Sequence, residues 1–271
     1  MKGFILSVRS EFYKSRKTLG FWCSIVLPLI IVALMFIGFI THSDKLGGMP
    51  GIMLWMSYVG PISLVMGNLL LPMYIIFVAY SVNAMEHKAD TWKTLFTLPI
   101  SKWSVYAAKY FYALFLVFFC LLLFYLFLLG SGNLLSMLKP ELKFTDFHIE
   151  GFLAQVYFKL FLVSLGILSI QFLLSLIWGD FLKPMGIGFV CTIASLISVG
   201  VNWQYAYLVP YAHPALALHT VLHTQRPAPG QPPAQPHLTV DLFTHEVWVS
   251  LIVAAAFFIL GFFIVQKKSV K

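Results

Sequence analysis

Residues 110–129 read YFYALFLVFFCLLLFYLFLL, twenty consecutive residues without a charged side chain. A helix needs about 20 predominantly apolar residues to cross the hydrocarbon core of a bilayer. In lipid the apolar side chains of such a helix can face outward, whereas in water they would have to be buried on every side. This stretch therefore predicts a membrane-spanning helix. Its large apolar side chains favour a position at the lipid-facing rim.

Further apolar stretches of similar length lie near residues 19–40, 57–82, 160–178, 185–201 and 247–265. The composition agrees, because 60% of the 271 residues are hydrophobic and only 10% are charged, against about 25% charged residues in soluble domains. The first stretch is longer than the apolar core of a signal peptide, and no A-x-A cleavage site follows it. A β-barrel is disfavoured, because its strands alternate apolar and polar residues. We predict an all-α membrane protein with six transmembrane helices.

Lysine and arginine are distributed unequally between the segments that connect these spans. Thirteen lie on one side, within residues 2–17, 88–109, 183 and 267–271, and four or five lie on the other, where Lys159 stands at the edge of a span. Loops rich in these residues stay in the cytoplasm. Both termini of the chain are therefore expected there.

The predicted spans lack the side chains that other membrane machines use. No Asp or Glu falls in the interior of a predicted span, and all eight histidines lie outside the spans. Ion-coupled transporters and haem-binding subunits keep such side chains inside the bundle. The chain also has no G-x-x-x-x-G-K-[ST] phosphate loop. If it transports a substrate, we expect the energy to come from a separate protein.

Residues 83–109 form the longest connecting segment on the basic side. Trp92, Leu95 and Phe96 give it an apolar side among charged residues, which suits a short interfacial helix that ends before Pro99. Such a helix could dock into a groove of a partner, with tryptophan as its anchor. A loop held at the membrane by its basic residues fits the same pattern, and the residues alone leave both interpretations open.

The run EHKADTWKTLFTLPISK, residues 86–102, resembles the intracellular loop between spans two and three of ABC-2 type transporter permeases. It is most similar to the branch that includes the lantibiotic-immunity and bacitracin-resistance permeases, in which an acidic residue precedes a T-W-K…L-P-I-S pattern. The basic amphipathic N-terminus and the six spans agree with this family. The resemblance implies a permease subunit in a bacterial cell membrane that is not itself an enzyme.

The resemblance also implies a mechanism and partners. In such permeases the loop contains a coupling helix that fits a cleft on a separate ATPase, which binds the ATP and Mg²⁺. The other expected partners are a second permease chain, identical or different, and membrane lipids, with no nucleic acid and no cofactor in this chain. The substrate would be hydrophobic or amphipathic, such as an antimicrobial peptide or a lipid-like molecule. The residues that match the coupling pattern are Glu86, Asp90, Thr91, Trp92, Lys93, Leu98 and Pro99.

We therefore expect a single transmembrane domain over residues 1–271. It would consist of an interfacial helix (1–18), spans one and two (19–82), the coupling segment (83–109), spans three to five (110–201), an outer segment (202–246), and span six with a basic tail (247–271). In the first of these, Phe4, Ile5, Val8 and Phe12 share one helical face.

Small and polar residues distinguish spans two and five. Span two contains Gly67 and Asn68, and span five carries a stripe at spacings of 3 and 4 residues, made of Gly188, Cys191, Ser195, Ser198 and Asn202. The resemblance implies that these two spans line a central cavity and that span five lies near the dimer interface. Close helix packing would explain the same residues. Both interpretations stay open.

The outer segment between spans five and six holds most of the histidines. Residues 205–222 are apolar enough to enter the membrane as a re-entrant helix. His219 and His223 have the spacing of zinc ligands, but the Glu of a zincin is missing and no outer Cys is present, so we predict no metal site. The alternatives to transport are a non-transporting membrane anchor or assembly scaffold, and, less favoured, a membrane-embedded enzyme that uses the outer histidines.

Overall fold

A computed structural model describes residues 2–89, 101–223 and 240–267 of the chain, and these residues include no β-strand. The predicted all-α architecture is confirmed, with six candidate membrane-spanning helices in this part of the chain. The elements are α1 (Lys2–Ser15), α2 (Leu19–Thr41), α3 (Ser43–Leu46), α4 (Gly51–Val65), η1 (Met66–Leu70), α5 (Leu71–Ala89), α7 (Lys102–Leu138), η2 (Phe144–Asp146), α8 (Glu150–Ile177), α9 (Leu182–Gly200), η3 (Ala206–Leu208), η4 (Pro210–Ala212), α10 (His213–His223) and α11 (His245–Lys267). Helices α4 and α5, joined by η1, form one continuous span over Gly51–His87.

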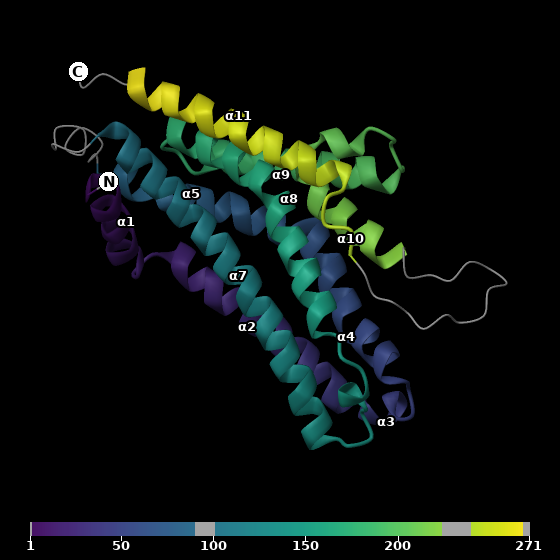
Figure 1. The fold of residues 1–271 in the computed structure, drawn as a ribbon. Coiled ribbons are helices and arrows are strands. Elements are labelled where there is room, and N and C mark those ends of the chain that lie inside the picture. Colours follow the sequence, from purple (N-terminus) through teal and green to yellow (C-terminus); the bar gives the residue numbers. More distant parts are fainter. Residues whose placement is uncertain (1, 90–100, 224–239, 268–271) are drawn as a thin grey trace.

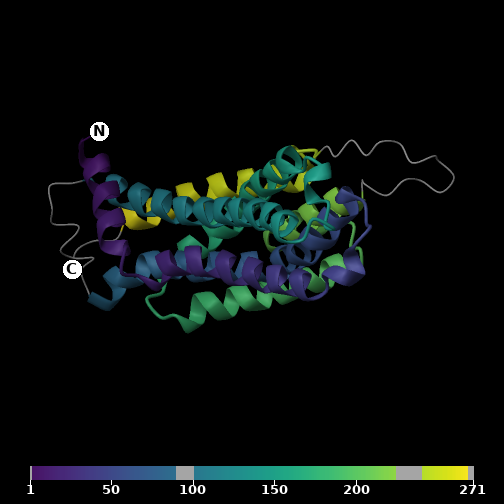
Figure 2. The same ribbon diagram turned by 90° about the horizontal axis from the view of Figure 1, so that it is seen from below.

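The long helices run side by side, with α1 lying across one end of the bundle and α3 at the other (Figures 1 and 2). Helix α8 packs on α11 and α5, and α2 packs on α7. We call the two ends the α1 end and the α3 end. Helix α5 reaches its last described turn, and α7 its first, at the α1 end, so both ends of the predicted coupling segment lie next to α1 (Figure 1).

The predicted rim position of the third span is wrong. Helix α7 contacts α1, α2 and α8, and side chains such as Phe124 and Leu128 are fully buried. In the most apolar part of α7, a larger share of the residues is buried inside the protein than in the corresponding parts of α2, α9 and α11. Hydropathy cannot distinguish a neighbouring helix from lipid, because both accept the same apolar side chains.

Span two contains a π-helical turn at Met66–Leu70. Such turns insert an extra residue into a helix and are frequent at functional sites. Gly67 in this turn allows α10 to come close, because a Cβ on it would lie 2.5 Å from Leu218 Cδ1 and 3.0 Å from the carbonyl oxygen of Pro214. The π-turn and α10 are therefore packed directly against each other.

Gly132 in α7 is the position at which the indole of Trp55 packs, and a Cβ there would overlap with the ring. The ring cannot swing aside, because Trp55 is 2% exposed and its Nε1 donates a hydrogen bond to the carbonyl oxygen of Phe144 at 2.9 Å. We expect Gly132→Ala to lower the free energy of unfolding by about 1–3 kcal/mol. Titration of the purified chain with SDS in bicelles would measure it. Gly130→Ala is the control, since no atom lies within 4 Å of its added Cβ, and an equal loss there would contradict the steric explanation.

Candidate functional site

Four charged side chains meet where α1 crosses the ends of α5 and α7. They are Glu11 and Lys14 on α1, Glu86 on α5 and Lys109 on α7, and we call them the four-charge cluster. The Lys109 ammonium lies 3.2 Å from Glu11 Oε1 and 2.5 Å from Glu86 Oε2. The Lys14 ammonium lies 2.6 Å from Glu11 Oε1 and also pairs with Glu86 Oε1. The cluster therefore joins three helices that are far apart in sequence.

The four-charge cluster is electrically balanced, and all of its members except the partly exposed Lys14 are buried. Lys109 is 0% exposed, while Glu11 and Glu86 are each 3% exposed. Burial alone would lower the pKa of Lys14, but the carboxylates of Glu11 and Glu86 outweigh this effect and raise the pKa above its usual value. Lys14 therefore stays charged at physiological pH. Removing one member would leave an unbalanced charge in a buried position, which is strongly destabilising.

Helix α1 turns a small polar face toward the bundle. Ser7, Glu11 and Ser15 are buried, whereas Ile5 and Leu6 are more than half exposed. Of the apolar face expected from the sequence, Phe12 does pack inward, with its ring 4.9 Å from that of Tyr112. The expected face is thus only partly buried, because the charge pairs of Glu11 and Lys14 determine which side of α1 meets the bundle.

The predicted coupling residues divide into two groups. Asp90, Thr91, Trp92, Lys93, Leu98 and Pro99 lie outside the described residues. Glu86 is described, and its carboxylate faces Lys14 and Lys109 of the same chain. The four-charge cluster therefore ties together the two helices that flank the predicted coupling segment.

Three members of the four-charge cluster, Glu11, Lys14 and Lys109, were not predicted from the sequence to belong to a site. A signal was present, since Glu11 is the only acidic residue before Asp44 and stands in an otherwise basic helix. A lone carboxylate among basic residues indicates a specific ionic partner. That the partner would include Lys109, 98 residues further along the chain, could not be read from spacing.

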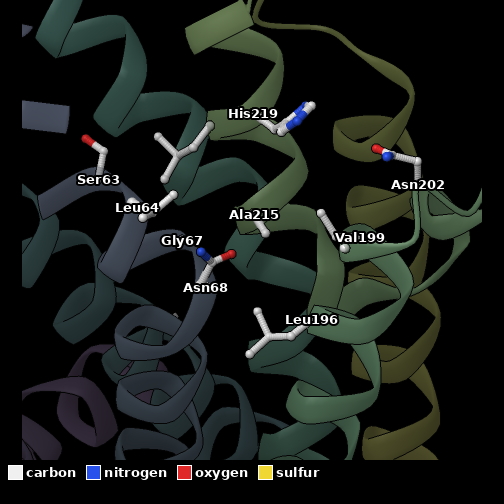
Figure 3. Close-up of a pocket in the computed structure, with 11 residues that line it drawn as sticks. Ser63, Leu64, Gly67, Asn68, Leu196, Val199, Asn202, Ala215 and His219 are labelled. Carbon is white, nitrogen blue, oxygen red and sulfur yellow. The ribbon is translucent and has the colours of Figure 1, made fainter. Parts of the chain in front are cut away.

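A cavity of about 570 Å³ is the second candidate site (Figure 3). Its walls come from α4, η1, the end of α9 and α10, and its lining residues are Ser63, Leu64, Gly67, Asn68, Leu196, Val199, Gly200, Asn202, Ala215, Leu218 and His219. Asn202 stands across the opening from Leu64 and Asn68 (Figure 3). Three of the residues predicted to line the substrate path or to pack at the dimer interface, Gly67, Asn68 and Asn202, are therefore brought together.

The chemistry of the cavity is mixed. The carboxamides of Asn68 and Asn202 and the hydroxyl of Ser63 can donate and accept hydrogen bonds, and the remaining lining is mostly apolar. None of the lining residues is an acid, a lysine or an arginine. Asn202 has a φ of 52°, a left-handed conformation that asparagine tolerates better than most residues. The cavity suits an uncharged polar group attached to an apolar one.

The sequence model described as ABC-2 family transporter protein matches residues 7–195, more than half of the chain. The chain belongs to the ABC-2 transporter family. No curated protein and no solved structure matches it. The matched residues include the whole four-charge cluster and end before Asn202 and α10. The chain is accordingly a multi-pass permease of the ABC transporter class.

The rest of the predicted stripe on α9 packs within the permease. A Cβ on Gly188 would overlap with Gln171 and Ile76, so α9 lies directly against α8 and α5 there. The hydroxyls of Ser195 and Ser198 donate to the carbonyl oxygens of Thr192 and Ser195 of their own helix, at 2.7 and 2.8 Å. Cys191 is half-buried on the same helix. Only Asn202 of this stripe lines the cavity.

In residues 2–89, 101–223 and 240–267 of the permease, no three His, Cys, Asp or Glu side chains are placed to hold a metal ion. His219 lines the cavity, and His213 is buried at the start of α10.

Proposed function

We propose that this permease is a transmembrane subunit of the lantibiotic-immunity and bacitracin-resistance type, driven by separate ATPase subunits that bind at the α1 end. The observation that supports this is the four-charge cluster. It joins α1 to the two helices that flank residues 90–100, the segment with the coupling pattern. A displacement of that segment by an ATPase would therefore move α1, α5 and α7 together.

The substrate is a hydrophobic or amphipathic molecule that binds in the cavity, such as an antimicrobial peptide or a lipid-like molecule. The apolar walls would hold the apolar part, while Asn68 and Asn202 would bond an uncharged polar group. One continuous span carries both Asn68 at the cavity and Glu86 in the four-charge cluster. These residues are 18 positions apart, about 27 Å along a helix. Span two would thus transmit motion from the ATPase to the substrate.

We further propose that two permease chains and two ATPases assemble in a bacterial cell membrane, with the α1 end in the cytoplasm. Each permease would contribute one transmembrane domain over residues 1–271, and the ATPases would bind the ATP and Mg²⁺. The thirteen lysines and arginines on the side of the termini support this orientation.

The test is purification of the tagged chain from its native membranes in mild detergent. We expect a Walker-motif ATPase and vanadate-sensitive ATP hydrolysis to accompany it. Trp92→Ala should reduce ATPase recovery at least ~10-fold, the effect of losing an interface anchor. The matched control is Trp203→Ala, a half-exposed tryptophan beyond the far end of α9, which should recover the ATPase in full. A permease that purifies alone from membranes lacking a dedicated ATPase would favour the scaffold function instead.

A further inference from the structure

A second group of buried polar side chains lies where α8, α10 and α11 meet. Lys159 on α8 is 1% exposed, and Glu246 in the first turn of α11 is 7% exposed. Lys159 Nζ and Glu246 Oε1 lie 3.3 Å apart. Lys159 was expected at the edge of a span, but α8 begins nine residues earlier, at Glu150. A buried charge pair therefore sits inside the helix bundle, where such pairs commonly mark function.

His213, the first residue of α10, belongs to the same group. It is 0% exposed, and its Nε2 donates to the carbonyl oxygen of Tyr207 at 2.8 Å. Its Nδ1 is buried and has no hydrogen-bond partner among the described residues. Burial lowers the pKa of His213 to about 4, although the Tyr207 carbonyl and the Glu246 charge act in the opposite direction. The imidazole is therefore neutral while α10 is in this position.

The surroundings of His213 offer it little compensation for a positive charge. The elements that pack on α10 carry these titratable side chains: Glu150, Tyr157 and Lys159 on α8, His245, Glu246 and Lys267 on α11, Tyr207 on η3, Tyr211 on η4, Lys183 and Cys191 on α9 and Tyr58 on α4. Glu246 already pairs with Lys159, and the Tyr211 hydroxyl accepts a hydrogen bond from Gln171 at 2.6 Å. Glu246 is the carboxylate whose charge acts on His213, and it is shared with Lys159.

Helix α10 has a second face, on which Ala215, Leu218 and His219 line the cavity (Figure 3). The position of α10 on α8 and α11 therefore determines the position of one wall of the cavity. We propose that His213 is a positioning residue that holds α10 on α8 and α11, and that protonation of its imidazole releases this wall of the cavity. The consequence for transport rests on the proposed function, whereas the movement of α10 does not.

The direction of the pH effect follows from linkage. We call the arrangement in which α10 packs on α8 and α11 the seated form, and the arrangement in which α10 has left this position the released form. In the released form His213 returns to an ordinary pKa of about 6.5, so protons bind the released form more tightly. The stability of the seated form is complete above about pH 6.5 and is lost as the pH falls toward the seated pKa of about 4. With these two values, the released fraction should rise about 30-fold between pH 7.5 and pH 5.

Cysteine modification measures the released fraction directly. Ala217 on α10 is 1% exposed, so a cysteine at this position reacts only when α10 leaves its seat. The purified chain would carry Ala217→Cys, with alanine at positions 23, 120 and 191, in lipid nanodiscs. Its rate of reaction with a methanethiosulfonate reagent is divided by that of a matched His219→Cys chain, because position 219 is exposed on the same helix. This ratio removes the effect of pH on the thiol.

We expect the ratio of rates to rise about 30-fold from pH 7.5 to pH 5. His213→Gln, which keeps a donor for Tyr207 but does not titrate, should abolish the rise, and His213→Asn should do the same. His245→Gln, at the exposed neighbouring histidine, should retain it. A rise below about threefold in the parent chain, or an equal rise in the His213 variants, would overturn the proposal. No ATPase or substrate is needed, so this outcome is separate from the co-purification result.

Discussion

Replacing Lys109 with methionine is expected to lower the free energy of unfolding of the permease by about 3–5 kcal/mol. The Lys109 side chain is completely buried, and its ammonium pairs with Glu11 and Glu86. Methionine fills a similar volume but leaves two buried carboxylates with Lys14 as their only cation within the four-charge cluster. The uncompensated negative charge then lies on carboxylates that are almost completely buried. SDS titration in bicelles measures the loss.

The same substitution at Lys183 is the matched control. Lys183 is 61% exposed and lies 4.0 Å from Asp180, so its loss should cost less than about 1 kcal/mol. The double variant Glu86→Gln with Lys109→Met removes one charge of each sign. It should cost at least about 1 kcal/mol less than the sum of the two single variants. Equal losses at positions 109 and 183, or strict additivity in the double variant, would show that the four-charge cluster is not a coupled unit.

The sequence predicted the six spans correctly because the signal for a span is local. About 20 apolar residues must cross the bilayer whatever they pack against, so stretches such as residues 110–129 are recognisable without knowledge of their neighbours. The same argument explains why the position of α7 was predicted wrongly. An apolar helix gives no indication of whether a protein helix or a lipid chain covers it.

Three of the residues that line the cavity were recognisable in the sequence as candidates for the substrate path or for close packing. Gly67, Asn68 and Asn202 stood out as small or polar residues in otherwise apolar spans, and all three line it. The contributions of α10, Ala215 and His219, depend on how the outer segment folds back against η1, which the spacing of residues does not encode. The close approach at Gly67 permits that packing, but a glycine does not specify what will approach it.

Buried charge pairs were the largest omission. Glu11 and Lys109 are 98 residues apart, and Lys159 and Glu246 are separated by 87 positions. Lys109, Lys159 and Glu246 each stand beside a predicted span end, where a charge in contact with headgroups or water is ordinary. Glu11 lies in the predicted interfacial helix, where a charge is equally ordinary. Only the helix lengths show that these charges lie inside the bundle, because α7 and α8 begin eight and ten residues before the predicted spans at Tyr110 and Leu160.

The ion pair between Lys159 and Glu246 should respond differently from the four-charge cluster. Glu246→Gln alone is expected to cost about 3–5 kcal/mol of unfolding free energy, because it leaves the Lys159 ammonium buried without a counter-charge. Lys159→Met alone should cost a similar amount. Glu150→Gln, at a half-exposed carboxylate on the same helix as Lys159, serves as the control in SDS titration and should change stability by less than about 1 kcal/mol.

The double variant Lys159→Met with Glu246→Leu decides what this pair contributes. Neither Lys159 Nζ nor Glu246 Oε1 has a hydrogen-bond partner among the described residues. The electrostatic attraction between these two charges is therefore the one interaction at these atoms that offsets the cost of removing them from water. An apolar pair of similar volume avoids that cost, and the double variant should be as stable as the parent or more stable by about 1–4 kcal/mol. The Glu86 and Lys109 double variant should not recover in this way, because Glu11 and Lys14 remain charged beside the altered positions. If the Lys159 and Glu246 double variant were as unstable as its single variants, a hydrogen-bonded network would have to hold this end of the bundle together.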